Sequence, residues 1–380
     1  MTLNRRNVVA AGAAAALLGA RPAAARTAAA YDAAMDAAFA AQAPVALAPV
    51  ALAGGVVTRE GLAWSGVRGV RRFGANDPAT LDDRWHFGSN TKAMTGALFA
   101  RLVEQGRTQW DAPLGELFPG MTIDPGWDGT TIRDFMGHRA GVKDAAALGM
   151  VFFMTARDDP RSLPEQRAAV VERVLGAPPS GPKGVYEYSN ADYMIVGAAI
   201  ERITGAPWEE AMRAEVYGPL GLTTGGFGGP VHNATGGANA WGHRGAGAGR
   251  IAMDPADPGA DNPLALGPAG TSHMTLADYA TWLGVFLNDG AGWLKSETVA
   301  TLSAPLAGEG TPYGLGWIVL PGKAWSRGPI LTHDGSNTLW YATAVVAPGL
   351  GAAFIALTNQ GDGAAATGLM PGLVRAFEAA

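Results

Sequence analysis

The chain has 380 residues, enough for one large domain or two ordinary ones, and 48% of them are hydrophobic, as in a globular protein with a full core. Its net charge is −5 and no run of like charges is longer than two, which gives no electrostatic basis for binding nucleic acid or an anionic membrane surface. Because cysteine is absent, disulfides, thiolate metal sites and a cysteine nucleophile are excluded. We therefore expect a small-molecule or peptide substrate.

The first 25 residues have the pattern of an export signal. Arg5-Arg6 is followed by an apolar stretch from Val8 to Ala20, which is too short to span a bilayer, and then by the small residues Ala23-Ala24-Ala25. This order is typical of a twin-arginine signal peptide. We expect residues 1–25 to be that signal and the mature chain, which has no apolar run of membrane-spanning length, to be periplasmic or secreted; the alternative is an N-terminal helix on a cytoplasmic protein.

The segments after the signal predict a helix, a hairpin of strands and a second helix. The first helix is expected from Tyr31 to Ala41, where apolar residues recur at helical spacing. The run from Val45 to Val57, with Gly54-Gly55 as a turn, and the stretch from Gly61 to Phe73 suggest the hairpin. The second helix spans Ser89 to Leu102, so its first residue lies at or near a helix N-terminus, where backbone N–H groups are free.

The middle of the chain, between about Gly106 and Leu266, is mostly helical, with helices separated by loops rich in Gly and Pro. The clearest helices are Pro164–Leu175, Asp192–Thr204 and Trp208–Val216. A long loop from Gly242 to Gly267 is of a length that is usually functional or mobile.

The last third of the chain predicts a helix from Thr275 to Leu287 and then strands separated by glycines at hairpin intervals, which favours an antiparallel sheet. The predicted strands are Tyr313–Leu320, Ile330–His333, Leu339–Ala347 and Ala352–Thr358, and a final helix spans Ala365–Phe377. The expected fold class is therefore α+β. Residues 30–105 and 270–380 would form an antiparallel sheet flanked by helices, with a mostly helical domain of residues 106–269 inserted between them.

The motif Ser89-Asn90-Thr91-Lys92 opens the second predicted helix. A serine hydroxyl needs a partner that removes its proton, and three residues along a helix is nearly one turn, so the Lys92 ammonium would lie beside the Ser89 hydroxyl. Burial would push the pKa of Lys92 down and allow it to act as a base. Alone the motif is weak, because a helix-capping serine followed by a solvated lysine has the same spacing.

A second element, Tyr188-Ser189-Asn190, precedes a predicted helix about a hundred residues later. Its phenol can relay a proton, and its amide can hold a substrate carbonyl.

A third element, His333-Asp334-Gly335, ends a predicted strand. Because side chains alternate along a strand, His333 and Gly335 share one face, and the glycine would leave room for a substrate to lie against the strand. The backbone N–H of Ser336 is a candidate to form an oxyanion hole together with that of Ser89.

These three elements resemble the S-x-x-K, Y/S-x-N and K/H-T/S-G-like elements that serine β-lactamases and penicillin-binding proteins carry in this order. The Y-x-N form resembles most closely the branch with class C β-lactamases, D-alanyl-D-alanine carboxypeptidases, D-aminopeptidases and related esterases. The segments Thr131–Gly141 and Tyr313–Trp317 also look like parts of that family, and the resemblance covers nearly all of the mature chain.

The resemblance implies a β-lactamase/transpeptidase-like fold with Ser89 as nucleophile. It further implies Lys92 and Tyr188 as the base system, without deciding which of them is the base, and Asn190 and His333 as substrate-binding residues. One departure bears on the substrate: the third element of a typical β-lactamase begins with a lysine that attracts a carboxylate, whereas His333 is mostly neutral at pH 7. This substitution weakens the β-lactamase interpretation.

Several other functional classes lack support in the sequence. The remaining histidines, His86, His138, His232, His243 and His273, show no metal-ligand spacing. There is no G-x-S-x-G elbow and no phosphate-binding loop. We expect no metal and no cofactor.

The sequence thus predicts an exported serine hydrolase that forms an acyl-Ser89 intermediate with esters, β-lactams or D-amino-acid peptides. Two alternatives remain open, a catalytically silent penicillin-binding-like module and an acyltransferase.

Overall fold

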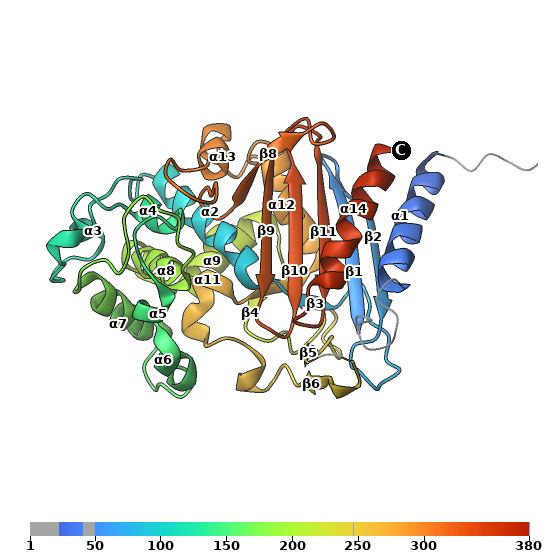
Figure 1. Cartoon of the computed structure of the whole chain (residues 1–380), viewed down its shortest axis with the longest axis horizontal. Coiled ribbons are helices and arrows are strands. Elements are labelled where there is room, and N and C mark those ends of the chain that lie inside the picture. The colour runs from blue at the N-terminus through green and yellow to red at the C-terminus, as the bar shows by residue number, and fades with distance from the viewer. Residues whose placement is uncertain (1–22, 41–49, 246, 380) are drawn as a thin grey trace, which may run out of the picture.

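The computed structural model describes residues 23–40, 50–245 and 247–379 (Figure 1). The predicted signal peptide lies outside the described residues except for Ala23–Ala25, which begin helix α1 (Ala23–Ala40). Among the described residues, no helix is both long and apolar enough to cross a membrane.

One six-stranded antiparallel sheet is built from both ends of the chain, as the strand pattern predicts. Its strand order is β2-β1-β11-β10-β9-β8. The strands are β1 (Ala51–Thr58), β2 (Gly61–Gly69), β8 (Ile318–Lys323), β9 (Gly328–Ser336), β10 (Tyr341–Ala347) and β11 (Ala352–Thr358). The α+β fold class with a helix-flanked antiparallel sheet is confirmed.

Helices cover both faces of this sheet (Figure 1). Helices α1 and α14 (Ala364–Glu378) pack side by side on one face, and α12 (Leu276–Leu287) packs on the other. A buried apolar cluster fills each interface, with Leu369 of α14 in one cluster and Leu283 of α12 in the other.

The prediction that Gly54-Gly55 forms a turn is wrong, because both glycines lie inside β1 and the hairpin turns after Thr58. A Cβ on Gly54 would lie 2.8 Å from the Leu369 side chain, and one on Gly55 would lie 2.9 Å from the Leu276 side chain. These glycines therefore let the helices on the two faces approach the strand closely.

The predicted strand Tyr313–Leu320 is also corrected, since β8 begins only at Ile318. The preceding residues form a turn in which Gly316 has a φ of 115°, and a Cβ there would lie 2.5 Å from the backbone of Ala93. This turn is pressed against helix α2 (Thr91–Glu104), which leaves no room for a continuous strand.

The helical part of the chain lies beside the sheet, on the left in Figure 1. Its helices are α3 (Leu114–Leu117), α4 (Ile132–Met136), α5 (Asp144–Ala147), α6 (Gly149–Thr155), α7 (Leu163–Leu175), α8 (Asn190–Thr204), α9 (Trp208–Met212), α10 (Gly218–Leu220) and α11 (Gly267–Gly270), and α13 (Ser296–Ser303) lies next to α2. A single apolar cluster joins residues from this part, such as Ile195, to residues of the sheet, such as Ile355. The domain boundaries given above stay a prediction.

The predicted loop from Gly242 to Gly267 contains a short hairpin instead, formed by β5 (Gly242–Arg244) and β6 (Ile251–Met253), followed by two 3₁₀ turns. Strands of three residues are too short to show an alternating pattern. The hairpin packs against the Trp340 ring. Gly242 lies so close to this ring that a Cβ on Gly242 would be 2.6 Å from it.

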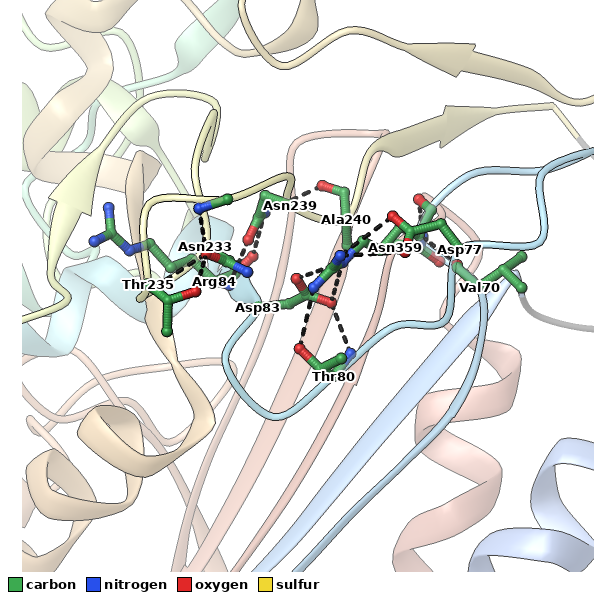
Figure 2. A network of polar contacts seen from close by, with 12 residues as sticks. Val70, Asp77, Thr80, Asp83, Arg84, Asn233, Thr235, Asn239, Ala240 and Asn359 are labelled. Atoms are coloured by element: carbon green, nitrogen blue, oxygen red, sulfur yellow. Dashed lines mark hydrogen bonds and ion pairs between the residues drawn. The ribbon is translucent and has the colours of Figure 1, made fainter.

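A second sheet, of three short strands in the order β3-β7-β4, supports the start of α2. These strands are β3 (Arg84–His86), β7 (Ser272–Thr275) and β4 (Gly226–Phe227). Figure 2 shows the polar network that holds the segment leading into β3 in place. The Asn239 amide accepts from the backbone N–H of Arg84 and donates to its carbonyl, at 2.7 and 2.9 Å, and the buried Asp83 carboxylate accepts from the Thr80 N–H at 2.8 Å.

Candidate active site

The nucleophile candidate lies on a tight turn between β3 and α2. Residues Gly88–Asn90 form one 3₁₀ turn in which Gly88 has a φ of 49°, a conformation that favours glycine. The Thr91 hydroxyl closes the turn by donating to the Gly88 carbonyl at 2.7 Å. Ser89 is half-buried and lies next to the first turn of α2, as the sequence predicts.

Lys92 is fully buried one helical turn after Ser89. Its ammonium nitrogen lies 3.1 Å from Ser89 Oγ, 2.8 Å from Asn190 Oδ1 and 2.7 Å from the Ala269 carbonyl oxygen. Burial lowers the pKa of Lys92 to about 7, and the negative charge of Asp144 opposes this shift. At neutral pH the amine therefore exists in both protonation states.

Tyr188 approaches Ser89 from the other side. Its hydroxyl donates to Ser89 Oγ at 2.6 Å, and its ring lies 4.7 Å from the Lys92 nitrogen. Although 36% of Tyr188 is exposed, burial of its hydroxyl end raises the pKa of the phenol above its usual range. The phenol is therefore protonated at neutral pH and acts as a donor.

Asn190 begins α8 and is held in one orientation by Asp144, the first residue of α5. The Asp144 carboxylate accepts from Asn190 Nδ2 at 2.9 Å, from Ser189 Oγ at 2.7 Å and from the Ala191 N–H at 3.0 Å. Because the amide nitrogen faces Asp144, the amide oxygen faces Lys92. In this structure the Asn190 amide accepts a hydrogen bond from Lys92. The substrate-binding role of Asn190 stays a prediction.

A buried His138–Asp192 pair lies beneath Tyr188. His138 has a φ of 58°, its Nδ1 lies 2.8 Å from Asp192 Oδ2, and its ring centre lies 4.5 Å from that of Tyr188. Burial lowers the pKa of His138 and raises that of Asp192, which favours the neutral forms of both. The His138 ring of this pair therefore packs against the Tyr188 ring.

Strand β9 carries the third predicted element past the nucleophile turn. Gly335 is buried on the same face as His333, while Asp334 points to the other face and is exposed, as predicted. The predicted reason for the glycine, room for a substrate, is wrong: a Cβ on Gly335 would lie 1.9 Å from the Phe87 carbonyl oxygen and 2.7 Å from the Ser89 nitrogen. The space is filled by the chain's own nucleophile turn.

The close packing of β9 against the nucleophile turn also brings the backbone amide of Ser336 to this turn. A Cβ on Gly88 would lie 2.4 Å from the Ser336 nitrogen. The Ser336 hydroxyl donates to the Trp340 carbonyl at 2.8 Å and so is held away from a substrate role. The two backbone amides named in the sequence prediction, those of Ser89 and Ser336, thus lie where β9 and the nucleophile turn meet.

His333 is buried and makes no direct bond to Ser89 or Lys92 in the described structure. Its Nε2 lies 2.9 Å from the Tyr313 hydroxyl and its Nδ1 lies 2.6 Å from the Asp334 carbonyl oxygen. Burial, with a smaller contribution from the Lys92 charge, lowers the pKa of His333 to about 3. The imidazole shares the site, but its ring centre is 6.3 Å from that of Tyr188.

A histidine that the sequence analysis set aside supports the nucleophile turn from behind. His86 Nδ1 accepts from the Gly88 N–H at 3.1 Å, so its other nitrogen, Nε2, carries the proton and donates to Asp261 Oδ2 at 2.9 Å. Asn337 donates to the second oxygen of Asp261 at 2.8 Å. The chain segment after β6 is thereby tied to both the nucleophile turn and the end of β9.

Sequence reasoning missed Asp144, His138, Asp192, Asp261 and the Ala269 carbonyl. The motif segment Thr131–Gly141 gave a partial signal for His138, whereas the sequence around an acidic residue does not identify the distant group that it binds. The described residues contain no group of three or more His, Cys, Asp or Glu side chains that could hold a metal ion.

Comparison with known proteins shows the family of the chain. The family model described as Beta-lactamase matches residues 20–377. The chain belongs to the Beta-lactamase family. This is a family of serine-hydrolase type, and its members include penicillin-binding proteins and carboxypeptidases.

Among relatives within this family, penicillin-binding protein 4 of Amycolatopsis lactamdurans is 26% identical over 311 residues, which cover 77% of this chain and 76% of that protein. The unguisins hydrolase ungD of Aspergillus violaceofuscus is 30% identical over 183 residues, 44% of this chain but only 30% of the relative. A putative D-alanyl-D-alanine carboxypeptidase of Escherichia coli K12 is 26% identical over 38% of this chain and 34% of its own length.

The fold is shared with solved structures of lower identity. The D-amino acid amidase of Ochrobactrum anthropi superposes with a TM-score of 0.70 at 19% identity, covering 92% of this chain and 98% of that one. The octameric penicillin-binding protein homologue of Pyrococcus abyssi gives 0.69 at 19% identity, over 87% of this chain and 73% of that one. The predicted β-lactamase/transpeptidase-like fold is confirmed.

Proposed function

We propose that this chain is a serine hydrolase that acts through a covalent acyl-Ser89 intermediate on esters, β-lactams or D-amino-acid peptides. One observation carries the proposal: Ser89 Oγ lies within hydrogen-bond distance of both the Lys92 amine and the Tyr188 phenol, at 3.1 and 2.6 Å. A nucleophile, a base and a proton donor in mutual contact are the parts that acyl transfer requires.

The protonation states divide the roles between the two partners. Since burial brings the pKa of Lys92 to about 7, its neutral form can accept the Ser89 proton. The two N–H groups of the neutral amine donate to Asn190 Oδ1 and to the Ala269 carbonyl oxygen. The raised pKa of Tyr188 keeps its proton available for donation. We therefore assign Lys92 as the base and Tyr188 as the group that relays a proton to the leaving group.

The cycle has two halves. Ser89 Oγ loses its proton to Lys92 and bonds to the substrate carbonyl carbon, whose oxygen takes the negative charge beside the amides of Ser89 and Ser336. The bond to the leaving group then breaks as that group receives the Tyr188 proton, which the Lys92 ammonium replaces, so that Lys92 is neutral again. Water, deprotonated by Lys92, attacks the acyl carbon in the second half, and the acid is released as Ser89 regains its proton.

The test is the variant Ser89→Ala, assayed with p-nitrophenyl esters, nitrocefin and a D-alanyl peptide, and labelled with a fluorescent fluorophosphonate. We expect loss of turnover and of labelling, with wild-type behaviour in the matched control Ser303→Ala, a half-buried serine at the end of α13. Mass spectrometry should place the probe on Ser89. Undiminished turnover in Ser89→Ala would rule out the proposal.

The same experiment separates the alternatives. Labelling of Ser89 without turnover of any substrate would indicate a binding module, and transfer of the acyl group to an added alcohol or amine in preference to water would indicate an acyltransferase.

We further propose that the enzyme is exported through its twin-arginine-like N-terminus. The support is the order of Arg5-Arg6, apolar stretch and small residues within positions 1–25. Replacement of both arginines by lysine should leave the protein in the cytoplasmic fraction, and unchanged export of that variant would contradict the proposal.

A further inference from the structure

The carboxylate of Asp261 lies between the two segments that carry the candidate oxyanion amides. Its Oδ2 accepts from His86 Nε2 at 2.9 Å, and its Oδ1 accepts from Asn337 Nδ2 at 2.8 Å. All three of these residues are buried. In the chain, His86 lies shortly before Ser89, and Asn337 directly follows Ser336. One buried carboxylate therefore bridges the nucleophile turn and the end of β9.

On the nucleophile side, both peptide groups of Gly88 are held by side chains. The Gly88 N–H donates to His86 Nδ1 at 3.1 Å, and the Gly88 carbonyl accepts from the Thr91 hydroxyl at 2.7 Å. In a trans peptide the N–H points away from the carbonyl, so the bond from Thr91 also sets the direction of the Ser89 N–H. Because glycine has many conformations open to it, these bonds restrict the turn. Asp261 fixes the tautomer and the orientation of the His86 ring from its other side.

On the strand side, Asn337 closes the turn that follows β9. Its Oδ1 accepts from the backbone N–H of Trp340 at 3.0 Å, while its Nδ2 donates to Asp261. The Trp340 ring stacks on the His86 ring, with ring centres 5.8 Å apart. The turn next to the Ser336 amide is thus tied to the nucleophile side twice, through a carboxylate and through stacked rings.

Asp261 is itself held by bonds within the chain. Its Oδ1 also accepts from the Asn262 N–H at 2.7 Å. Arg157 donates to the Asp261 backbone carbonyl and, at 3.1 Å, to the carbonyl of Pro258. Because a carboxylate offers two oxygens, one side chain can fix donors from two separate segments at once. Asp261 bonds to neighbours of the two amides rather than to the nucleophile, so any effect on the reaction is transmitted through those neighbours.

An oxyanion hole depends on the exact position of its donors, and removal of a single donor lowers kcat about 10²- to 10³-fold. We propose that Asp261 is a positioning residue for the oxyanion hole. It holds the amides of Ser89 and Ser336 at the spacing that the oxyanion requires. It does so through His86 on one side and Asn337 on the other. This inference rests on the proposed function and adds the residue that aligns the two amides.

The test compares p-nitrophenyl acetate with its thionoester, in which sulfur replaces the carbonyl oxygen. Sulfur is larger and accepts hydrogen bonds only weakly, so two aligned amides favour the carbonyl ester. The kcat/KM values are measured from nitrophenol release, which accompanies acylation and does not require deacylation. Asp261→Ala should lower the ratio of kcat/KM for the ester to that for the thionoester at least tenfold. Asp261→Asn, which keeps one acceptor oxygen, and Asn337→Ala, which removes one arm, should lower it at least threefold.

Asp257→Asn is the matched control, because Asp257 is exposed on the same segment and its carboxylate accepts from the nearby Gly259 N–H. This variant should keep the wild-type ratio. The ratio does not depend on the amount of folded enzyme, so a merely structural role of Asp261 would leave it unchanged. If Asp261→Ala does not fold, Asp261→Asn and Asn337→Ala decide. A wild-type ratio in the folded variants would overturn the inference.

Fluorophosphonate labelling of Ser89 in the wild-type enzyme is measured in parallel. Absence of labelling or of nitrophenol release in the wild type would count against the proposed function itself. Labelling and release with an unchanged ratio in the Asp261 variants would mean that only the inference fails.

Discussion

The two sides of the site are built differently. On the helical side, polar groups are linked in a chain that ends on the nucleophile, from Asp144 through Asn190 and Lys92 to Ser89. On the strand side, His333 and its partners bind one another and leave the nucleophile alone. The helical side therefore handles the proton, while the strand side packs against the nucleophile turn and fixes its shape.

If this comparison holds, the largest effect should come from the helical side at Lys92. Lys92→Ala removes the base and should lower kcat by about 10²- to 10⁴-fold. Lys92→Arg should be similarly poor, because a guanidinium does not give up its proton near pH 7. Steady-state kinetics with a p-nitrophenyl ester, with circular dichroism to confirm folding, gives the answer, and activity within tenfold of wild type would break the comparison.

The strand side should respond through shape, and Gly335 tests this. Because its added Cβ would lie 1.9 Å from the Phe87 carbonyl, Gly335→Ala should displace β9 from the nucleophile turn. We expect a loss of about 1–3 kcal/mol in the free energy of unfolding, measured by urea denaturation, together with a fall in kcat. Gly115→Ala is the matched control, since a Cβ there meets nothing within 4 Å. Equal stability of the two variants would argue against the close approach.

Asp144 should have an intermediate effect, because it acts through Asn190. Asp144→Asn loses hydrogen bonds to a charged group, each about 1.5–3 kcal/mol, and should lower kcat about 10- to 100-fold. Since the Asp144 charge raises the pKa of Lys92, its removal should also move the acid limb of the rate profile to lower pH, which a merely structural role would not do. The exposed Asp158→Asn serves as control. A normal kcat or an unmoved limb would count against this role.

The smallest expected effect is the pH dependence of the rate, which distinguishes Lys92 on the helical side from His333 on the strand side. Lys92 must be neutral to accept a proton and its pKa is about 7, so kcat/KM should rise about tenfold per pH unit below 7 and level off above it. His333, with a pKa of about 3, should add no step between pH 5 and 9. A profile that is flat across this range would contradict the assignment of Lys92 as base.

Local patterns predicted much of this molecule. The three-residue spacing of Ser89 and Lys92 and the alternation of His333 and Gly335 along a strand follow from the geometry of helices and strands, which neighbours in the chain determine. The position of Tyr188-Ser189-Asn190 before a helix is of the same kind.

Long-range packing decided the rest. The sequence predicted a turn at Gly54 and room for a substrate at Gly335. In the structure both glycines let their strands pack closely against segments hundreds of residues away. Asp144 and Asp261 have no sequence pattern that identifies their partners, because a hydrogen bond between distant segments depends on where the fold places them. By itself the sequence determined which chemical groups the site contains; only the tertiary structure decided which of them are buried, and burial sets the pKa of Lys92 and the charge of His333.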